Sequence, residues 1–244
     1  MIRLLAILLL SSLAPAQNQG PMDGGIASAP PCVAPTMTYR WTPTSGCSTS
    51  TPCATDQVSG NNASQTSSGA LPTYGATCGP NSTPCLTFNG SSDYIVPTTA
   101  IPANPTAFTL YAVMEATTVS VHNPLFGGNN SGISFKVDPS NVMDLSVQGV
   151  SDAFGSQTIA ASTWYTQVVT YDNGTTTGSF YAASGGGLTA HGSGSAAGFT
   201  ATTPNLGGIP LQGIFFTGNI AEWGYLNSVS TAGIANWSSC HYGV

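Results

Sequence analysis

The near absence of charge is the feature that most constrains how this chain folds. Only 5% of its 244 residues are charged, whereas an ordinary soluble domain has about 25%. Solvent-facing helices depend on Lys, Arg and Glu spaced three or four residues apart, and these residues are too scarce here to build such faces. Polar turn residues replace them, including 29 glycines, and they suit short strands joined by turns. The composition predicts an all-β fold and excludes a helical bundle.

The sign of the few charges limits the partners. Three Lys and Arg residues stand against nine Asp and Glu residues, so no basic surface can neutralise the phosphates of a nucleic acid. Hydrophobic residues make up 41% of the chain, which is too many for a disordered protein and enough for a packed core. We therefore exclude a nucleic-acid partner and expect a globular domain.

The first sixteen residues have the pattern of a secretory signal peptide. Arg3 stands within an apolar run over 2–10, and small residues at 14–16 form a cleavage site after Ala16. A bilayer needs ~20 apolar residues and no later stretch reaches that length, so no membrane span is expected. We predict a secreted protein, extracellular or at the cell surface, with a signal peptide over 1–16, a flexible lead-in over 17–35 and one domain over 36–244.

Six cysteines in an exported chain indicate disulfide bonds. Two pairs of them each flank a short turn, and the remaining two stand near opposite ends of the mature chain. A zinc site is the alternative, but it requires closer spacing and further Cys or His ligands nearby. The predicted pairs are Cys32–Cys240, Cys47–Cys53 and Cys78–Cys85.

Short apolar segments, each ended by Gly, Asn, Asp or Pro, are spaced as in a β-sandwich. The clearest alternation runs over 164–171, and the turn sequence at 172–174 predicts that 177–183 pairs back onto it. One short helix is predicted over 230–237 with Ser230 as its N-cap, and the polar segments 42–74 and 184–198 are predicted loops. The other predicted strands are 38–41, 85–88, 94–96, 108–116, 124–127, 133–137, 143–148, 205–209 and 215–226.

Five segments, taken in order, resemble the laminin-G-like members of the concanavalin A-like lectin and glucanase superfamily. The segment 86–95 is similar to the pattern L-x-F-D-G-S-x-D-Y-V, with Asn89 in place of Asp. The segment 164–174 is similar to W-x-H-V-x-x-T-Y-D-G, with Gln167 in place of His. The resemblance covers about residues 38–240. It implies a jelly roll of two antiparallel sheets whose first and last strands lie side by side, as a Cys32–Cys240 bond would require. The segments are 56–65 with 71–74, 86–95, 108–114, 164–174 and 216–230.

Two glutamates, Glu115 and Glu222, are the candidates for glycoside hydrolysis, which uses a pair of carboxylates. The glucanase pattern E-x-D-x-x-E, which places alternate side chains on one face of a strand, is absent from the sequence. Glu222 coincides with a Glu that the laminin-G-like pattern keeps in members without catalysis, so the resemblance favours a structural role. No G-x-S-x-G elbow accompanies His122, His191 and His241, and these are interpreted as surface residues.

Calcium is the one cofactor that the sequence brings into consideration, since many relatives hold it with carboxylates and backbone carbonyls. Asp93, Asp138 and Asp144 stand at turn positions and are the candidate ligands. No D-x-D-x-D-G loop accompanies them, and aspartates at such positions are usually turn residues.

These observations predict a non-catalytic carbohydrate-binding or cell-adhesion module whose partner is a glycan or a surface protein. A glycoside hydrolase or polysaccharide lyase using Glu115 and Glu222 is the first alternative. A self-associating extracellular structural protein is the second, and the oligomeric state stays open. Most of the four tryptophans are expected to be core anchors because each buries a large area, while the uncharged polar surface suits neutral glycans. Sequons for N-glycosylation stand at Asn62, Asn81, Asn89, Asn129, Asn173 and Asn236.

Overall fold

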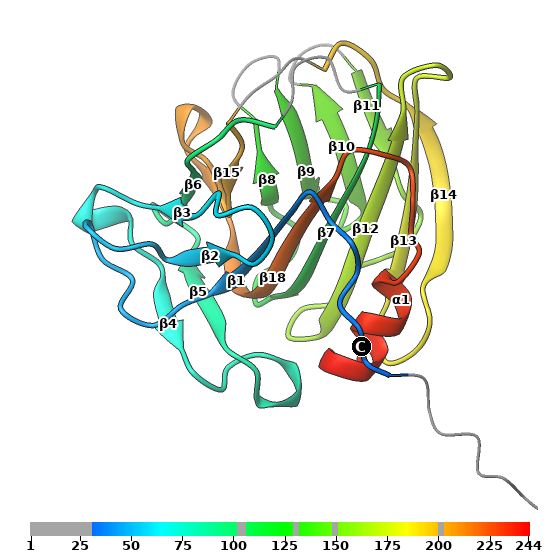
Figure 1. The fold of residues 1–244 in the computed structure, drawn as a ribbon. Coiled ribbons are helices and arrows are strands. Elements are labelled where there is room, and N and C mark those ends of the chain that lie inside the picture. The colour runs from blue at the N-terminus through cyan, green and yellow to red at the C-terminus, as the bar shows by residue number, and fades with distance from the viewer. Residues whose placement is uncertain (1–30, 102–105, 129–131, 148–150, 200–202) are drawn as a thin grey trace, which may run out of the picture. The chain divides into compact units, whose positions relative to one another are not determined.

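Two ten-residue strands, β7 (Ala107–Ala116) and β18 (Thr217–Leu226), pair in the middle of the larger sheet (Figure 1). The structure is a computed structural model that describes residues 31–101, 106–128, 132–147, 151–199 and 203–244. Within it, Cys32–Val244 form one compact unit. The predicted signal peptide, 1–16, and all but the end of the predicted lead-in, 17–35, lie outside the described residues.

The larger sheet continues on both sides of this central pair, and its strands are antiparallel. Beyond β7 lie β12 (Trp164–Asp172), β13 (Thr177–Ala183) and β14 (Thr189–Ser195). Beyond β18 lie β1 (Tyr39–Pro43), β2 (Ala54–Asp56), β3 (Ala63–Ser64) and β6 (Val96–Pro97). The first half of β18 pairs instead with β5 (Cys85–Asn89), which also pairs with β4 (Thr73–Gly75).

A smaller antiparallel sheet packs against the larger one. Its order is β11 (Ser151–Phe154), β10 (Met143–Val147), β9 (Ile133–Val137), β8 (Asn123–Gly127) and β15 (Asn205–Leu206). A hairpin follows β15, made of β16 (Gly208–Ile209), the 3-10 turn η3 (Pro210–Gln212) and β17 (Ile214–Phe215). Backbone hydrogen bonds between Ile95 and Leu206 close one edge of the sandwich, and a bond from Ser156 to His191 closes the other. The predicted all-β antiparallel sandwich is confirmed.

Alternation along the strands builds the main core between the two sheets. In β7, Leu110, Ala112 and Met114 belong to this core. Tyr111 and Val113 face the other way and pack in a second apolar cluster on the outer face of the larger sheet. Both faces of β7 are therefore buried, which explains why its sequence is apolar almost without interruption.

A C-terminal cap, formed by α1 (Ile234–Trp237), the π-helical turn η4 (Ser238–Tyr242) and the last two residues, covers the second cluster. The first strand, β1, pairs with the last, β18, as the resemblance implied. The start of the described chain runs to the cap in Figure 1, where Cys32 and Cys240 are bonded with their Cα atoms 5.6 Å apart. The other disulfides join Cys47 to Cys53 and Cys78 to Cys85. Among the described residues, no helix has the length and apolar character to cross a membrane.

Two segments predicted to be loops contain strands. The segment 42–74 includes β2, β3 and the start of β4, each of which has only two or three residues. The Asp56 carboxylate fixes the end of β2 because it accepts the backbone N–H groups of Arg40, Ser59 and Asn61. The segment 184–198 contains β14, which pairs with β13 although its sequence T-A-H-G-S-G-S has no apolar face. Pairing with a neighbouring strand forms these strands although their own residues lack an apolar face, so the residue pattern does not predict them. β11, which pairs with β10, was not predicted either.

The predicted helix over 230–237 starts later than the sequence suggests. α1 begins at Ile234, and its N-cap is Gly233 with φ +79°, not Ser230. Ser230 Oγ instead accepts the N–H of Ala232 at 3.2 Å and stabilises the preceding turn. Because a left-handed φ favours glycine, Gly233 determines where the helix can begin. The prediction of a single short helix near the C-terminus holds for the described residues.

Opening the Cys32–Cys240 bond should destabilise the fold more than opening a short bridge. Loop-closure entropy for a separation of 208 residues corresponds to about 5 kcal/mol, against about 2 kcal/mol for the separation of six at Cys47–Cys53. We expect Cys32→Ala/Cys240→Ala to lose more free energy of unfolding in urea than Cys47→Ala/Cys53→Ala. Equal losses would contradict this assignment.

Candidate functional site

Polar side chains cover the outer face of the smaller sheet. The apolar residues of β9 and β10 pack in the main core, so the alternate residues Ser134, Lys136, Asp144 and Ser146 point outward. The strand register places Lys136 opposite Asp144 and Ser134 opposite Ser146. Although they lie on an outer face, none of the four is more than 8% exposed.

The neighbouring strand β11 extends this face. Asp152 lies opposite Ser146, and Phe154 lies opposite Asp144. Ala153, between them, packs in the main core, so Asp152 and Phe154 share the outward direction. Phe154 is 47% exposed, and an aromatic ring is therefore accessible beside the buried polar groups.

The hairpin β16–η3–β17 lies over part of this face and leaves a polar cavity of about 150 Å³. An adjoining hollow of about 260 Å³ shares His122 and Ile214 with it and is also lined by Val121 and Phe215. We call the second space the apolar hollow. Residues of the sheet and of the hairpin line the polar cavity: His122, Ser134, Lys136, Ser146, Asp152, Ile209, Gln212 and Ile214.

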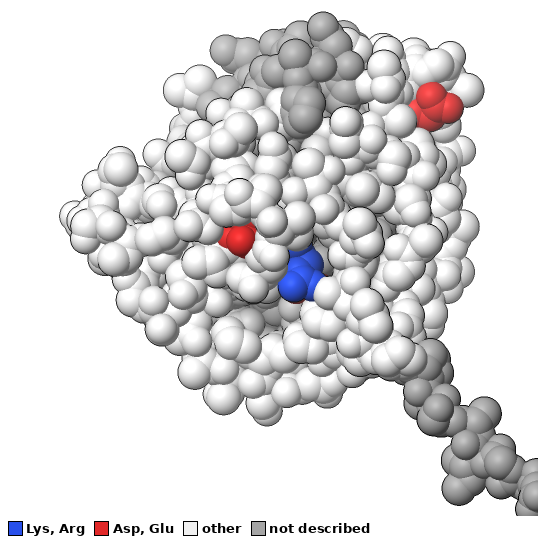
Figure 2. Space-filling model, viewed as in Figure 1, with Lys and Arg blue, Asp and Glu red and all other residues white. Residues whose placement is uncertain are grey.

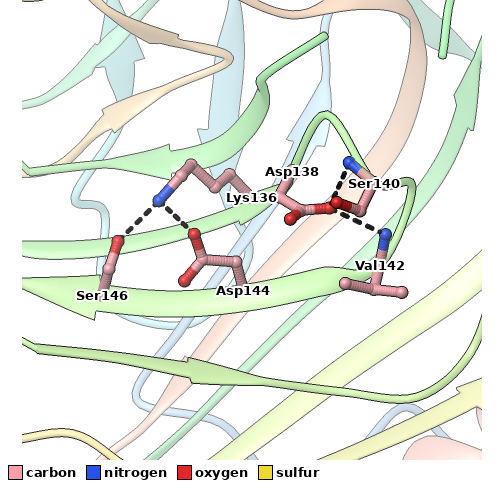
Figure 3. A network of polar contacts seen from close by, with 6 residues as sticks. All are labelled: Lys136, Asp138, Ser140, Val142, Asp144 and Ser146. Atoms are coloured by element: carbon pink, nitrogen blue, oxygen red, sulfur yellow. Dashed lines mark hydrogen bonds and ion pairs between the residues drawn. The ribbon is translucent and has the colours of Figure 1, made fainter. Parts of the chain in front are cut away.

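An ion pair crosses the floor of the cavity from β9 to β10. Lys136 Nζ pairs with Asp144 Oδ2 and also donates to Ser146 Oγ at 2.6 Å (Figure 3). Burial raises the pKa of Asp144 to about 6, even though the nearby Lys136 ammonium acts in the opposite direction. Burial thus disfavours the ionised form of this carboxylate, and the group takes up a proton at about pH 6.

Three polar atoms at this face are buried without a hydrogen-bond partner in the protein: Ser134 Oγ, Asp144 Oδ1 and His122 Nδ1. Leaving such a group unpaired costs about 1–3 kcal/mol, and buried polar atoms are nearly always paired with protein, water or a ligand. Ser134 and His122 line the polar cavity. The cavity is therefore a place where a bound molecule would find groups ready to pair.

The structure does not gather the predicted calcium ligands into one site. Asp93 follows β5 and accepts the backbone N–H of Asn89 at 3.0 Å. Asp138 closes the turn after β9 by accepting the N–H groups of Ser140 and Val142 (Figure 3), and Asp144 pairs with Lys136. The described residues contain no group of three or more His, Cys, Asp or Glu placed to hold a metal ion.

Glu115 and Glu222 lie on the same face of neighbouring strands, but Glu222 is covered. Glu222 in β18 lies opposite Val113 in β7. Glu115 lies two residues further along β7. Glu115 accepts the amide of Asn219 at 2.8 Å and is partly exposed. Glu222 is 0% exposed, because the C-terminal cap lies over it. A substrate would have to displace the cap before it could contact both carboxylates.

Three donors converge on the Glu222 carboxylate. It accepts hydrogen bonds from Tyr111 Oη, from Trp237 Nε1 at 2.9 Å and from Tyr242 Oη at 3.0 Å. The Tyr111 ring crosses Gly224, where an added Cβ would lie 1.9 Å from the ring, so glycine at this position allows the hydroxyl to reach Glu222. Burial raises the pKa of Glu222 although these donors favour the charged form. The arrangement fastens the cap to the larger sheet.

The histidines lie in three different elements. His122 lines the polar cavity, His191 is on β14, and His241 stacks on Trp237 in the cap with ring centroids 4.1 Å apart. Trp41 and Trp223 are core residues with 0% exposure, whereas Trp164 and Trp237 are partly buried. The tryptophans therefore offer no exposed platform among the described residues, and Phe154 is an exposed ring on the same strand face as Asp152.

The sequence reasoning did not identify the polar cavity. Its signal lies in the alternation I-S-F-K-V in β9 and M-D-L-S in β10, where polar residues occupy every second position. Such a pattern normally describes a solvated face, and only the hairpin over 208–215, distant in sequence, makes it a buried one.

Removing the Glu222 carboxylate should loosen the cap. Glu222→Ala leaves Tyr111, Trp237 and Tyr242 without their acceptor, and we expect a loss of about 3–5 kcal/mol in the free energy of unfolding. Glu115→Ala, on the same face, should cost less than about 1 kcal/mol, since it removes a single half-exposed bond. Urea unfolding followed by tryptophan fluorescence compares the two. A similar loss in both variants would show that the three donors do not depend on Glu222.

The titration of Asp144 should be visible in the stability of the protein. Its pKa is 3.8 in the unfolded chain and about 6 in the fold, so the folded state binds the proton more tightly. Its contribution to stability is therefore fully present below pH 4 and is lost as the pH rises through 6, by about 3 kcal/mol. The measurement is the free energy of unfolding of the wild type minus that of Asp144→Asn. This difference should be larger at pH 4 than at pH 7 by about this amount. A flat difference would contradict the prediction.

Comparison with known proteins bears on the fold. No family model and no curated protein matches the sequence. Among solved structures, the Trypanosoma rangeli sialidase in complex with sialic acid is similar with a TM-score of 0.58 and 14% identity, over 86% of this chain and 34% of that chain. A heptameric SAP-like pentraxin from Limulus polyphemus is similar with a TM-score of 0.50 and 13% identity, over 66% of this chain and 83% of that chain.

The similarities are structural and partial. This chain spans about a third of the sialidase. The LG1-3 region of the laminin α2 chain has a TM-score of 0.39 and 18% identity, over 52% of this chain and 29% of that chain, which is too distant to support membership of the laminin-G-like group. That membership stays a prediction. What the comparisons show is the fold alone, an antiparallel β-sandwich of the jelly-roll type.

Proposed function

We propose that this chain is a secreted, non-catalytic glycan-binding module and that the polar cavity holds a sugar residue. The observation that carries the proposal is a pair of buried polar atoms that line the cavity and have no partner in the protein, Ser134 Oγ and His122 Nδ1. Asp144 Oδ1, on the same sheet face as Ser134, is also unpaired. A sugar hydroxyl can donate to one group and accept from another. It is therefore a suitable partner for a surface on which donors and acceptors alternate.

The cavity offers both kinds of group on rigid strands. Lys136 Nζ has three N–H donors, of which Asp144 and Ser146 engage two. Asp152 supplies carboxylate oxygens, and Gln212 supplies an amide from the covering hairpin. Binding sites commonly combine a few fixed polar groups with an apolar surround, and here Ile209 and Ile214 provide part of that surround.

Apolar contacts are available next to the polar ones. Phe154 presents an exposed ring two residues from Asp152 on the same strand face, and aromatic side chains supply large apolar contact areas at binding sites. On the other side, Val121 and Phe215 line the apolar hollow. A sugar has hydroxyl edges and apolar C–H faces. The polar cavity can bind the hydroxyls, and the neighbouring apolar side chains can pack against the C–H faces.

Secretion is part of the proposal and is supported by the cysteines. All six form disulfides, and such bonds persist in oxidising compartments outside the cytoplasm. The surface supports a neutral partner, since Figure 2 shows a face on which blue and red atoms are sparse. With so few charges, affinity for a partner cannot depend on charge complementarity across a broad surface.

The proposal is tested by glycan-array and polysaccharide pull-down assays of the mature chain. Ser134 Oγ has no partner in the protein, so Ser134→Ala should leave the urea midpoint unchanged or raise it. The loss of one hydrogen bond to the sugar should weaken binding about five- to tenfold. Ser134→Leu, which fills the cavity, should abolish binding.

The matched controls are Ser193→Ala and Ser193→Leu on the exposed part of β14, and both should bind as the wild type does. Binding that survives Ser134→Leu in a folded protein would place the glycan elsewhere. An absence of binding to every glycan tested would overturn the proposed function.

A further inference from the structure

The charges around the polar cavity are of both signs. Lys136 and Asp152 line the cavity itself, and Lys136 is already paired with Asp144. Asp138, in the turn after β9, adds a third carboxylate near this face, and His122 lies in the field of the charges of Lys136, Asp138 and Asp152. One ammonium group therefore stands among three carboxylates, which come from this turn, from β10 and from β11.

We infer that the cavity prefers neutral sugar residues to acidic ones, with Asp152 as the residue that enforces the choice. This inference rests on the proposed function. An acidic sugar would bring its carboxylate to a surface whose only ammonium is already engaged by Asp144, and it would face Asp152 without compensation. A neutral polyol meets no such repulsion, because its hydroxyls can accept from Lys136 and donate to the carboxylates.

The position of Asp152 separates it from the structural ion pair. Asp152 lies opposite Ser146 in the register of β10 and β11, whereas Asp144 lies opposite Lys136 in that of β9 and β10. Lys136 and Asp144 hold the two strands together, and both side chains are almost fully buried. Asp152 is exposed and lines the cavity, so changing its charge alters what a ligand meets while leaving the ion pair intact.

The size of the cavity limits the ligand to one residue or its edge. Its volume is about 150 Å³. Asp152 is exposed, so water and salt screen its repulsion of an acidic sugar. The discrimination against acidic sugars should therefore weaken as the salt concentration rises.

The experiment compares matched neutral and acidic sugars by isothermal titration calorimetry at 0.15 M salt and pH 7.5. The pairs are methyl glucoside with methyl glucuronide, and methyl galactoside with methyl galacturonide. Short oligomers of the same residues extend each comparison. We expect the neutral member of the pair that binds to do so at least tenfold more tightly than its acidic counterpart.

Asp152→Asn tests the residue that is assigned the selection. It keeps the shape of the side chain and removes its charge, so the ratio of the neutral to the acidic affinity should fall about tenfold. Asp172→Asn, at the end of β12 in the larger sheet, makes the same change in net charge away from the cavity and should leave both affinities unchanged. An equal fall of this ratio in both variants would assign the effect to net charge and overturn the role of Asp152.

The outcomes separate this inference from the proposed function. Acidic sugars that bind as tightly as neutral ones, with binding lost in Ser134→Leu, would overturn the selectivity and leave the glycan-binding function standing. A neutral preference that is the same in the wild type and in Asp152→Asn would also overturn it. An absence of binding to all of the sugars and oligomers would overturn both.

Discussion

The pairing of β18 along both of its edges is the interaction on which the rest of this structure depends. One edge pairs with β7 over nearly its whole length, and the other pairs with β5 and then β1. From this strand, Trp223 Nε1 donates to the carbonyl of Leu125 in β8, and the N–H of Thr217 donates to Asn123 Oδ1. These bonds hold the two sheets together at β8. His122, which directly precedes β8, lines the polar cavity. A bulge in β18 turns Glu222 outward beneath the C-terminal cap.

The Lys136–Asp144 pair is difficult to explain by stability alone. A buried ion pair is often no more stabilising than a well-packed apolar pair of similar volume, because both ions lose their hydration. Lys136 is one of only three Lys and Arg residues in the whole chain, yet it stands on a sheet face where an apolar residue would pack without cost. The raised pKa of Asp144 shows that the cost is not fully offset. A ligand that pairs with the remaining polar atoms would account for retaining these groups.

The sequence predicted the fold well because the signals for it are local. Strand 133–137 and strand 177–183 have the predicted bounds, since each alternates or runs apolar between turn residues. β2, β3 and β14 were not predictable in this way, because they are short or polar and become strands only by pairing with neighbouring strands. The helix start depended on the backbone of Gly233 and not on the capping residue Ser230. The cavity was not predictable, because its floor and its cover are separated by about sixty residues.

The placement of the polar cavity on strands explains how a chain with so little charge could recognise a ligand with any selectivity. Groups on β9 and β10 are fixed by the register of the sheet, so they lose little freedom when they bind, and rigid elements position polar groups better than loops do. Unpaired atoms such as Ser134 Oγ reduce the stability of the unbound fold. The disulfide between Cys32 and Cys240 constrains the unfolded chain over nearly the whole domain and offsets that loss. A rigid, cross-linked sandwich can therefore keep unsatisfied groups in place until a ligand satisfies them.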